Sequence, residues 1–76
     1  MTVKFFARAA EIAGCDSVQT DAAGNLKDLR IWLTEQWPSL HDTAFVTAVN
    51  LQIIHDENHQ LNSNDEIAIL PPFSGG

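Results

Sequence analysis

The chain has little cysteine and no long apolar run, and each shortage excludes a class of protein. Cys15 is its only cysteine, so no disulfide can form within the chain and no thiol pair is present for redox chemistry or zinc binding. We therefore expect a cytoplasmic location. The apolar residues after Met1 are too few for a signal peptide, and no segment has the length of a membrane span. We expect no membrane partner.

Positive charge is also scarce. Four lysines and arginines stand against ten aspartates and glutamates, which gives a formal net charge of −6. A phosphate backbone would be repelled by such a chain, whereas basic protein surfaces would be attracted to it. The composition therefore predicts protein partners and no nucleic acid.

The usual catalytic signatures are missing as well. The sequence has no glycine-rich phosphate loop, no nucleophile elbow and no paired metal-ligand motifs. His55 and His59 flank a polar turn that offers no rigid geometry, so we predict no metal site. Cys15 lies in a loop without basic neighbours, which favours an inert thiol. The chain therefore does not look like an autonomous enzyme.

What is present is enough apolar material for one domain, since 45% of the 76 residues are hydrophobic. Residues 2–7 alternate as a strand, with Val3, Phe5 and Ala7 on one face and Lys4 and Phe6 on the other. Residues 8–13 favour a short helical turn that ends at a glycine. Residues 17–20 form a weak second strand that returns beside the first.

A longer helix is predicted over residues 26–37. Asn25 is a good N-cap, and Asp28 places a carboxylate where the first helical amides are free. Pro38 ends the helix. Its apolar residues recur at spacings of three and four, with two further residues widening the stripe: Leu26, Leu29, Ile31, Trp32, Leu33, Trp37 and Leu40. We expect Trp32 to pack in or near the core rather than bind a ligand.

The remaining chain is rich in β-forming residues. Residues 45–54 read as strand, interrupted near Asn50 by either a turn or a bulge. Turns follow at residues 56–58 and 62–65, and a last strand covers residues 66–70. One helix must then pack on a mixed sheet, which predicts an α+β fold of the β-grasp type over residues 1–70. Residues 71–76 are expected to form a flexible tail.

The tail carries the chemistry that the rest of the sequence lacks. It reads Pro71, Pro72, Phe73, Ser74, Gly75 and Gly76, and it contains no charged side chain. The glycines remove every Cβ from the last two positions, and the prolines reduce the entropy lost when the tail is threaded into a partner. Six extended residues span roughly 20 Å. A frayed terminus is the alternative, but this composition favours a tail that inserts Gly76 into a partner, with Phe73 as an apolar anchor.

The alternation of side chains between the two faces of a strand predicts a docking surface. If Val3 and Phe5 point inward, Phe6 faces outward, and Ala68 and Leu70 share one face of the last strand. We predict that Phe6, Ala68 and Leu70 form a partner-docking patch beside the exit of the tail. The alternative is that Phe6 only covers neighbouring residues of the sheet.

Over nearly its whole length the chain resembles the small, sulfur-carrying subunits of molybdopterin synthase, which are related to the thiamine sulfur carriers. The resemblance is carried by residues 3–8, 11–14 and 48–50, by the helix that contains Leu29, and most specifically by residues 64–76. It departs from the family at Ala10, where many relatives carry arginine. It departs again at Asn64, which replaces a glycine, and at Phe73, which replaces a valine.

The resemblance implies a β-grasp fold and a cycle that runs through Gly76. An adenylating, E1-like activating enzyme would use ATP on the terminal carboxylate, and a sulfur donor protein would convert it to a thiocarboxylate. The tail would then enter the large synthase subunit, within a heterotetramer, and give sulfur to cyclic pyranopterin monophosphate. The carrier itself would bind no cofactor, and the catalytic groups would belong to its partners.

Three alternatives remain open on the sequence. A sulfur carrier for thiamine or tRNA thiolation would use the same chemistry at Gly76. A ubiquitin-like modifier would be joined to lysines of other proteins. A noncovalent β-grasp binding module would have no need of Gly75 and Gly76.

Overall fold

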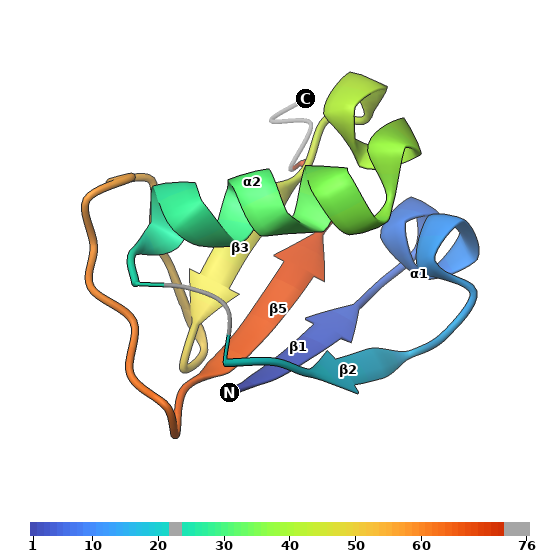
Figure 1. Cartoon of the computed structure of the whole chain (residues 1–76). Coiled ribbons are helices and arrows are strands. Elements are labelled where there is room, and N and C mark those ends of the chain that lie inside the picture. Colours follow the sequence, from blue (N-terminus) through green and yellow to red (C-terminus); the bar gives the residue numbers. More distant parts are fainter. Residues whose placement is uncertain (22–23, 73–76) are drawn as a thin grey trace.

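The computed structural model describes residues 1–21 and 24–72, and it places one mixed sheet beneath one main helix (Figure 1). The sheet has the strand order β2-β1-β5-β3-β4. Its central pair, β1 and β5, is parallel, and the other neighbouring strands are antiparallel. The strands are β1 (Thr2–Phe5), β2 (Ser17–Gln19), β3 (Val46–Val49), β4 (Gln52–Ile53) and β5 (Glu66–Leu70). The helix α2 (Leu26–Gln36) crosses one face, which confirms the predicted β-grasp fold.

The first strand is shorter than predicted. Val3 and Phe5 are buried as expected, but β1 ends at Phe5 and Ala7 is exposed. Ala7 has φ 53° and ψ −126°, and the amide of Ala9 donates to the carbonyl of Phe6 at 3.2 Å. These are the dihedrals of the first central residue of a type II′ turn, a position that glycine favours. The prediction that Ala7 shares the buried face is therefore wrong, because this turn redirects the chain.

The short helix α1 (Arg8–Ala13) follows that turn and ends as predicted. Gly14, at φ 72°, caps the helix, and its amide donates to the carbonyl of Ala10 at 2.9 Å. A left-handed residue at this position usually has to be glycine. The chain then returns along β2, antiparallel to β1, which confirms the expected second strand.

Local contacts define the start of α2, and a proline-led 3-10 helix follows its end. The Asn25 side chain accepts a hydrogen bond from the Asp28 amide at 2.9 Å, and the Asp28 carboxylate accepts one from the Asn25 amide at 3.3 Å. This reciprocal capping satisfies two backbone donors. After Gln36 the chain enters the 3-10 helix η1 (Pro38–Asp42), an element that the sequence analysis missed. Proline is well tolerated in a first helical turn, where the amide needs no partner.

The apolar stripe of α2 is narrower than predicted. Leu26, Leu29 and Leu33 are buried, and Trp32 packs half-buried against the core with its ring centroid 5.8 Å from that of Trp37. Ile31 is 49% exposed, so its assignment to the stripe is wrong. Ile31 follows Leu29 by two residues. This spacing rotates its side chain by more than half a turn about the helix axis, so it points to solvent.

The break near Asn50 is a turn and not a bulge. Asn50 (φ 50°) and Leu51 (φ 71°) are both left-handed, and they join β3 to β4 as a two-residue hairpin of the type I′ class. Leu51 is 94% exposed. Its side chain therefore contributes almost nothing to the core.

A buried carboxylate fixes the start of β5. Asp65 accepts hydrogen bonds from the amide of Asn62 at 2.7 Å and from the side chain of Asn50 at 2.9 Å. The bond from Asn62, followed by the bond from Asn50, outweighs desolvation and lowers the pKa of Asp65 below its ordinary value of 3.8. Asn50 in turn accepts from the amide of Glu66 at 3.0 Å, so the hairpin and the predicted turn at residues 62–65 are held together.

The core lies between α2 and the covered face of the sheet. Val3, Ile67 and Ile69 of the central strands meet Leu26, Leu29 and Leu33 there, and all six are at most 1% exposed. In the described part of the chain, every buried side-chain nitrogen or oxygen has a hydrogen-bond partner. None of the helices described in this structure has the length and apolar character needed to cross a membrane.

Candidate functional site: the end of the central strand

The tail leaves the domain from the end of β5, the middle strand of the sheet. β5 runs between β1 and β3 and ends at Leu70, and Pro71 and Pro72 follow it as exposed residues. A proline has no amide to donate, so it cannot continue the strand ladder. The predicted tail residues Phe73, Ser74, Gly75 and Gly76 lie outside the described residues. Their roles, and the division of the chain at residue 70, stay predictions.

A small, mainly apolar cavity of about 180 Å³ lies where the tail departs, and we call it the tail-exit cavity. Residues from the end of β1, from α1, from the segment before β3 and from the end of β5 meet around it. They are Phe6, Arg8, Ala9, Thr43, Ala44, Phe45, Leu70, Pro71 and Pro72. Two of the three docking-patch residues, Phe6 and Leu70, are thus placed beside the first two tail residues.

The backbone holds Phe6 at this end of the sheet. Its amide donates to the carbonyl of Ile69 at 3.1 Å, which continues the parallel pairing of β1 and β5 by one residue. The side chain is 44% exposed, while Ala68 and Leu70 are half-buried. Ala68 is opposite Lys4 in the register and does not line the tail-exit cavity. The docking role of the patch stays a prediction.

The face of the sheet away from α2 carries apolar residues that the sequence analysis missed. Val46 is opposite Leu70, and Ala48 is opposite both Ala68 and Ile53, so these residues lie on the same face as the patch. Ile53 is 37% exposed. Strand parity would have identified them, but only with the pairing register of the hairpin, which the ambiguity at Asn50 left open.

One charged contact lies on this face, and another involves Phe45, a wall of the tail-exit cavity. Lys4 forms an ion pair with Glu66 across β1 and β5, and both side chains are about half exposed. Arg30 lies 5.5 Å above the ring of Phe45 and 3.3 Å from Glu57. At such exposure each pair adds little to stability, so their effect is mainly on the shape and charge of the surface.

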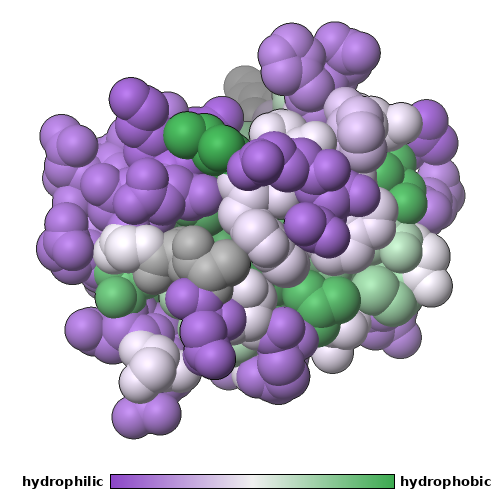
Figure 2. All heavy atoms as spheres, in the orientation of Figure 1, coloured by the Kyte–Doolittle hydropathy of each residue, from purple (hydrophilic) through white to green (hydrophobic). Residues whose placement is uncertain are grey.

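The helix-covered side of the molecule is mostly hydrophilic. Figure 2 shows hydrophilic side chains over most of this view, with apolar side chains in small separate groups. In the described ranges, no group of three histidine, cysteine, aspartate or glutamate side chains is arranged to hold a metal ion. The tail exit and the adjoining sheet face therefore form the strongest candidate site.

Comparison with known families identifies the chain. The model of the ThiS family matches residues 3–76. The chain belongs to the ThiS family. This ThiS-family chain is 38% identical to a molybdopterin synthase sulfur carrier subunit from Dictyostelium discoideum, across 97% of the chain and 93% of that relative. It is 34% identical to the human protein of the same name, with 97% and 91% covered.

Solved structures show the same fold. The small archaeal modifier protein 1 from Methanosarcina acetivorans superposes with a TM-score of 0.79 and 25% identity, over 99% of this ThiS-family chain and 94% of that protein. A complex of subunits 1 and 2 of the molybdopterin-converting factor from Helicobacter pylori contains a chain with a TM-score of 0.61 and 27% identity. The match covers 99% of the ThiS-family chain and 96% of that chain.

Proposed function

We propose that this chain is the sulfur carrier subunit of a molybdopterin synthase. The observation that carries the proposal is its likeness to two molybdopterin synthase sulfur carrier subunits over 97% of its length. The sequence also has glycines at the fifth and sixth positions beyond the central strand, Gly75 and Gly76, as a carrier with a slim reactive end needs. The domain supplies recognition, and the tail supplies reach.

The working group in this proposal is the carboxylate of Gly76. Adenylation of that carboxylate, with ATP used by the activating enzyme, converts a poor electrophile into an acyl group with a good leaving group. Sulfide-level sulfur from a donor then displaces AMP and leaves a thiocarboxylate. Transfer of this sulfur to cyclic pyranopterin monophosphate, with oxygen supplied by water, returns Gly76 to the carboxylate. Pro71 and Pro72 are exposed and cannot continue the strand ladder, which suits a tail that a partner's active site receives.

The partners follow from the same cycle. The large synthase subunit is supported by the Helicobacter pylori complex, in which a chain similar to this one is found with subunit 2 of the converting factor. An E1-like activating enzyme and a sulfur donor protein complete the proposed set. We place the cycle in the cytoplasm, in keeping with a chain that has one cysteine and can form no internal disulfide.

Intact-mass measurement tests the proposal. The chain would be purified from cells that retain its sulfur-loading machinery, and also incubated with activating enzyme, ATP and sulfur donor. We expect a mass gain equal to one exchange of oxygen for sulfur, and no gain in a variant that lacks Gly76. A chain that stays unmodified in both preparations would contradict the proposal.

The same preparations separate the alternatives. The likeness to an archaeal modifier protein makes conjugation the competing use of a Gly-Gly end. Conjugation would appear as slower-migrating species on a denaturing gel, lost with Gly76, in place of a thiocarboxylated free chain. A noncovalent binding module would keep its partners when Gly75 and Gly76 are both deleted.

A further inference from the structure

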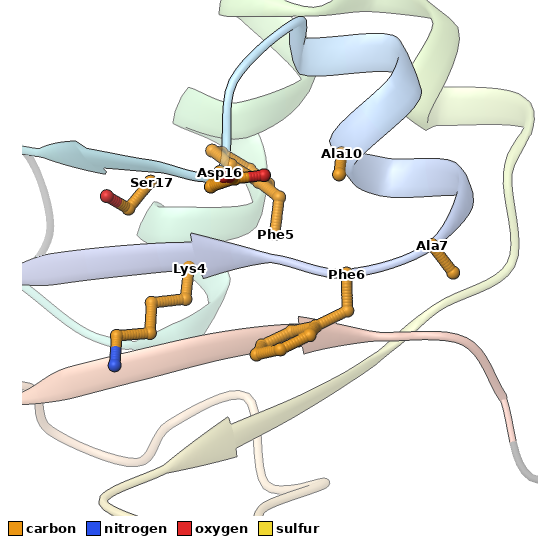
Figure 3. Close-up of a pocket in the computed structure, with 7 residues that line it drawn as sticks. All are labelled: Lys4, Phe5, Phe6, Ala7, Ala10, Asp16 and Ser17. Atoms are coloured by element: carbon orange, nitrogen blue, oxygen red, sulfur yellow. The ribbon is translucent and has the colours of Figure 1, made fainter.

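A second and larger cavity, of about 440 Å³, shares Phe6 with the tail-exit cavity. It lies between the end of β1, the start of α1 and the start of β2. Its walls are Lys4, Phe5, Phe6, Ala7, Ala10, Asp16 and Ser17. The side chain of Ala10 is a single methyl group that points into the gap (Figure 3). The cavity can therefore admit a long side chain from outside.

The two charged side chains on the rim of this cavity, Lys4 and Asp16, differ in whether they have a partner within the chain. The ammonium of Lys4 is engaged by Glu66 and points away from the gap, toward β5 (Figure 3). The carboxylate of Asp16 points toward α1 and has no hydrogen bond or ion pair with any described residue. The backbone of Asp16 is nevertheless fixed, because its carbonyl accepts from the amide of Phe5 at 2.8 Å. An exposed carboxylate with no protein partner among the described residues is thus held at the edge of a cavity with an aromatic wall.

We propose that this cavity receives an arginine side chain of the large synthase subunit. The inference rests on the proposed function and adds to it a specificity contact outside the tail. The long aliphatic stem of arginine would pack against Phe6 and Ala10, and its guanidinium would bond to Asp16. Arginine fits better than lysine because its planar guanidinium can form two parallel hydrogen bonds to one carboxylate.

Two further observations favour this occupant. The chain has a net charge of −6, so its partners are expected to present basic surfaces. Phe6 also lines the tail-exit cavity, so a protein that binds at the tail-exit cavity would lie next to the second cavity. The arginine would then fix the rotation of the carrier about the axis of its inserted tail.

Affinity for the purified large subunit tests the inference with a charge-matched control. Asp16→Asn removes the carboxylate and keeps the shape, while Glu35→Gln makes the same change of net charge on the exposed surface of α2. We expect Asp16→Asn to raise Kd about tenfold or more, and Glu35→Gln to change it much less. Ala10→Leu, which fills the cavity while Asp16 stays intact, should also weaken binding. Thermal unfolding of each free variant separates loss of affinity from loss of folding.

Chemical protection identifies the partner residue. The large subunit would be treated with phenylglyoxal, alone and in complex, and its modified arginines mapped by mass spectrometry. We expect one arginine to be protected by the wild-type carrier and by Glu35→Gln, and exposed again with Asp16→Asn at the same fraction bound. If the wild-type chain does not bind the large subunit, the proposed function fails. If it binds, and Asp16→Asn matches the control or no arginine is protected, only the arginine inference is overturned.

Discussion

Among single residues, Ala7 has the least favourable backbone conformation for its side chain. Its φ of 53° with ψ −126° is the conformation that glycine adopts readily in a type II′ turn. Ala7→Gly removes the strain, worth about 1–3 kcal/mol, and costs less than about 1 kcal/mol in unfolded-state entropy. We expect a net gain of about 1 kcal/mol in the free energy of unfolding, measured by urea denaturation.

A matched substitution on the following helix serves as the control. Ala10→Gly makes the same chemical change inside α1, where the conformation is ordinary and glycine is unfavourable. It should lower the free energy of unfolding by about 1 kcal/mol. If both variants are destabilised alike, the left-handed turn at Ala7 does not exist in solution.

Asp65 gives the fold a predictable pH dependence. Its pKa is lowered from 3.8 because two donors, the Asn62 amide and the Asn50 side chain, stabilise the carboxylate. A carboxyl with a lowered folded pKa adds stability above its unfolded pKa, and this stability is lost as the pH falls through the folded value. We expect Asp65→Asn to lower the free energy of unfolding by about 1–3 kcal/mol at neutral pH.

The difference in the free energy of unfolding between wild type and Asp65→Asn should become smaller as the pH falls below 3.8, because the wild-type carboxyl also becomes neutral there. Urea denaturation of both proteins across that range measures it. Glu35→Gln, a change on the exposed surface of α2, controls for net charge. A deficit that does not depend on pH would show that the carboxylate charge at Asp65 is not what stabilises the turn.

At the scale of the elements, the start of α2 depends on the reciprocal bonds between Asn25 and Asp28. Asn25→Ala leaves the Asp28 amide without its partner and should lower the free energy of unfolding by about 1 kcal/mol. The double variant with Asp28→Ala should lose less than the sum of the two single losses, because each residue supports the other's bond. Chemical denaturation of the four proteins completes the cycle. If the losses in the free energy of unfolding add, the reciprocal capping between Asn25 and Asp28 is contradicted.

The elements also show why some features could be predicted from sequence. The cap at Asn25, the leucine spacing of α2 and the glycine at the end of α1 are local signals, and each was confirmed. The errors arose where tertiary packing decides. Ala7 alternates correctly for a strand that in fact ends earlier, and Leu40, which continues the leucine spacing of α2, is buried from the separate element η1.

The candidate site, too, could be predicted only where local sequence patterns determine it. Parity placed Phe6 and Leu70 on one side of the sheet, and the structure puts both on the walls of the tail-exit cavity. Val46 and Ile53 join that face only through pairing between strands distant in sequence. Neither cavity could be predicted. Each is formed where several segments meet, and one sequence alone does not reveal which distant segments lie close together in space.

Considered as a whole molecule, the domain has two different faces. α2 covers one side of the sheet, and most of that view is hydrophilic. The opposite face carries Phe6, Leu70 and Ile53, and the tail follows the end of β5, the middle strand of the sheet. A partner that binds the tail and buries apolar surface would therefore contact the face away from α2.

One pair of substitutions tests which face contacts the partner. Phe6 and Ile31 are both apolar and similarly exposed, at 44% and 49%, but they lie on different sides of the domain. Phe6→Asp should weaken binding to the large synthase subunit by about tenfold or more, since it places a charge where apolar surface is to be buried. Ile31→Asp should leave Kd within about twofold, because a substitution outside the interface removes no contact there. Isothermal titration calorimetry measures both, and the heat-capacity change on binding should become less negative only for Phe6→Asp. If Phe6→Asp binds as tightly as wild type, Phe6 is only a cover for its own sheet. If Ile31→Asp is the variant that fails, the carrier presents its helical face to the synthase.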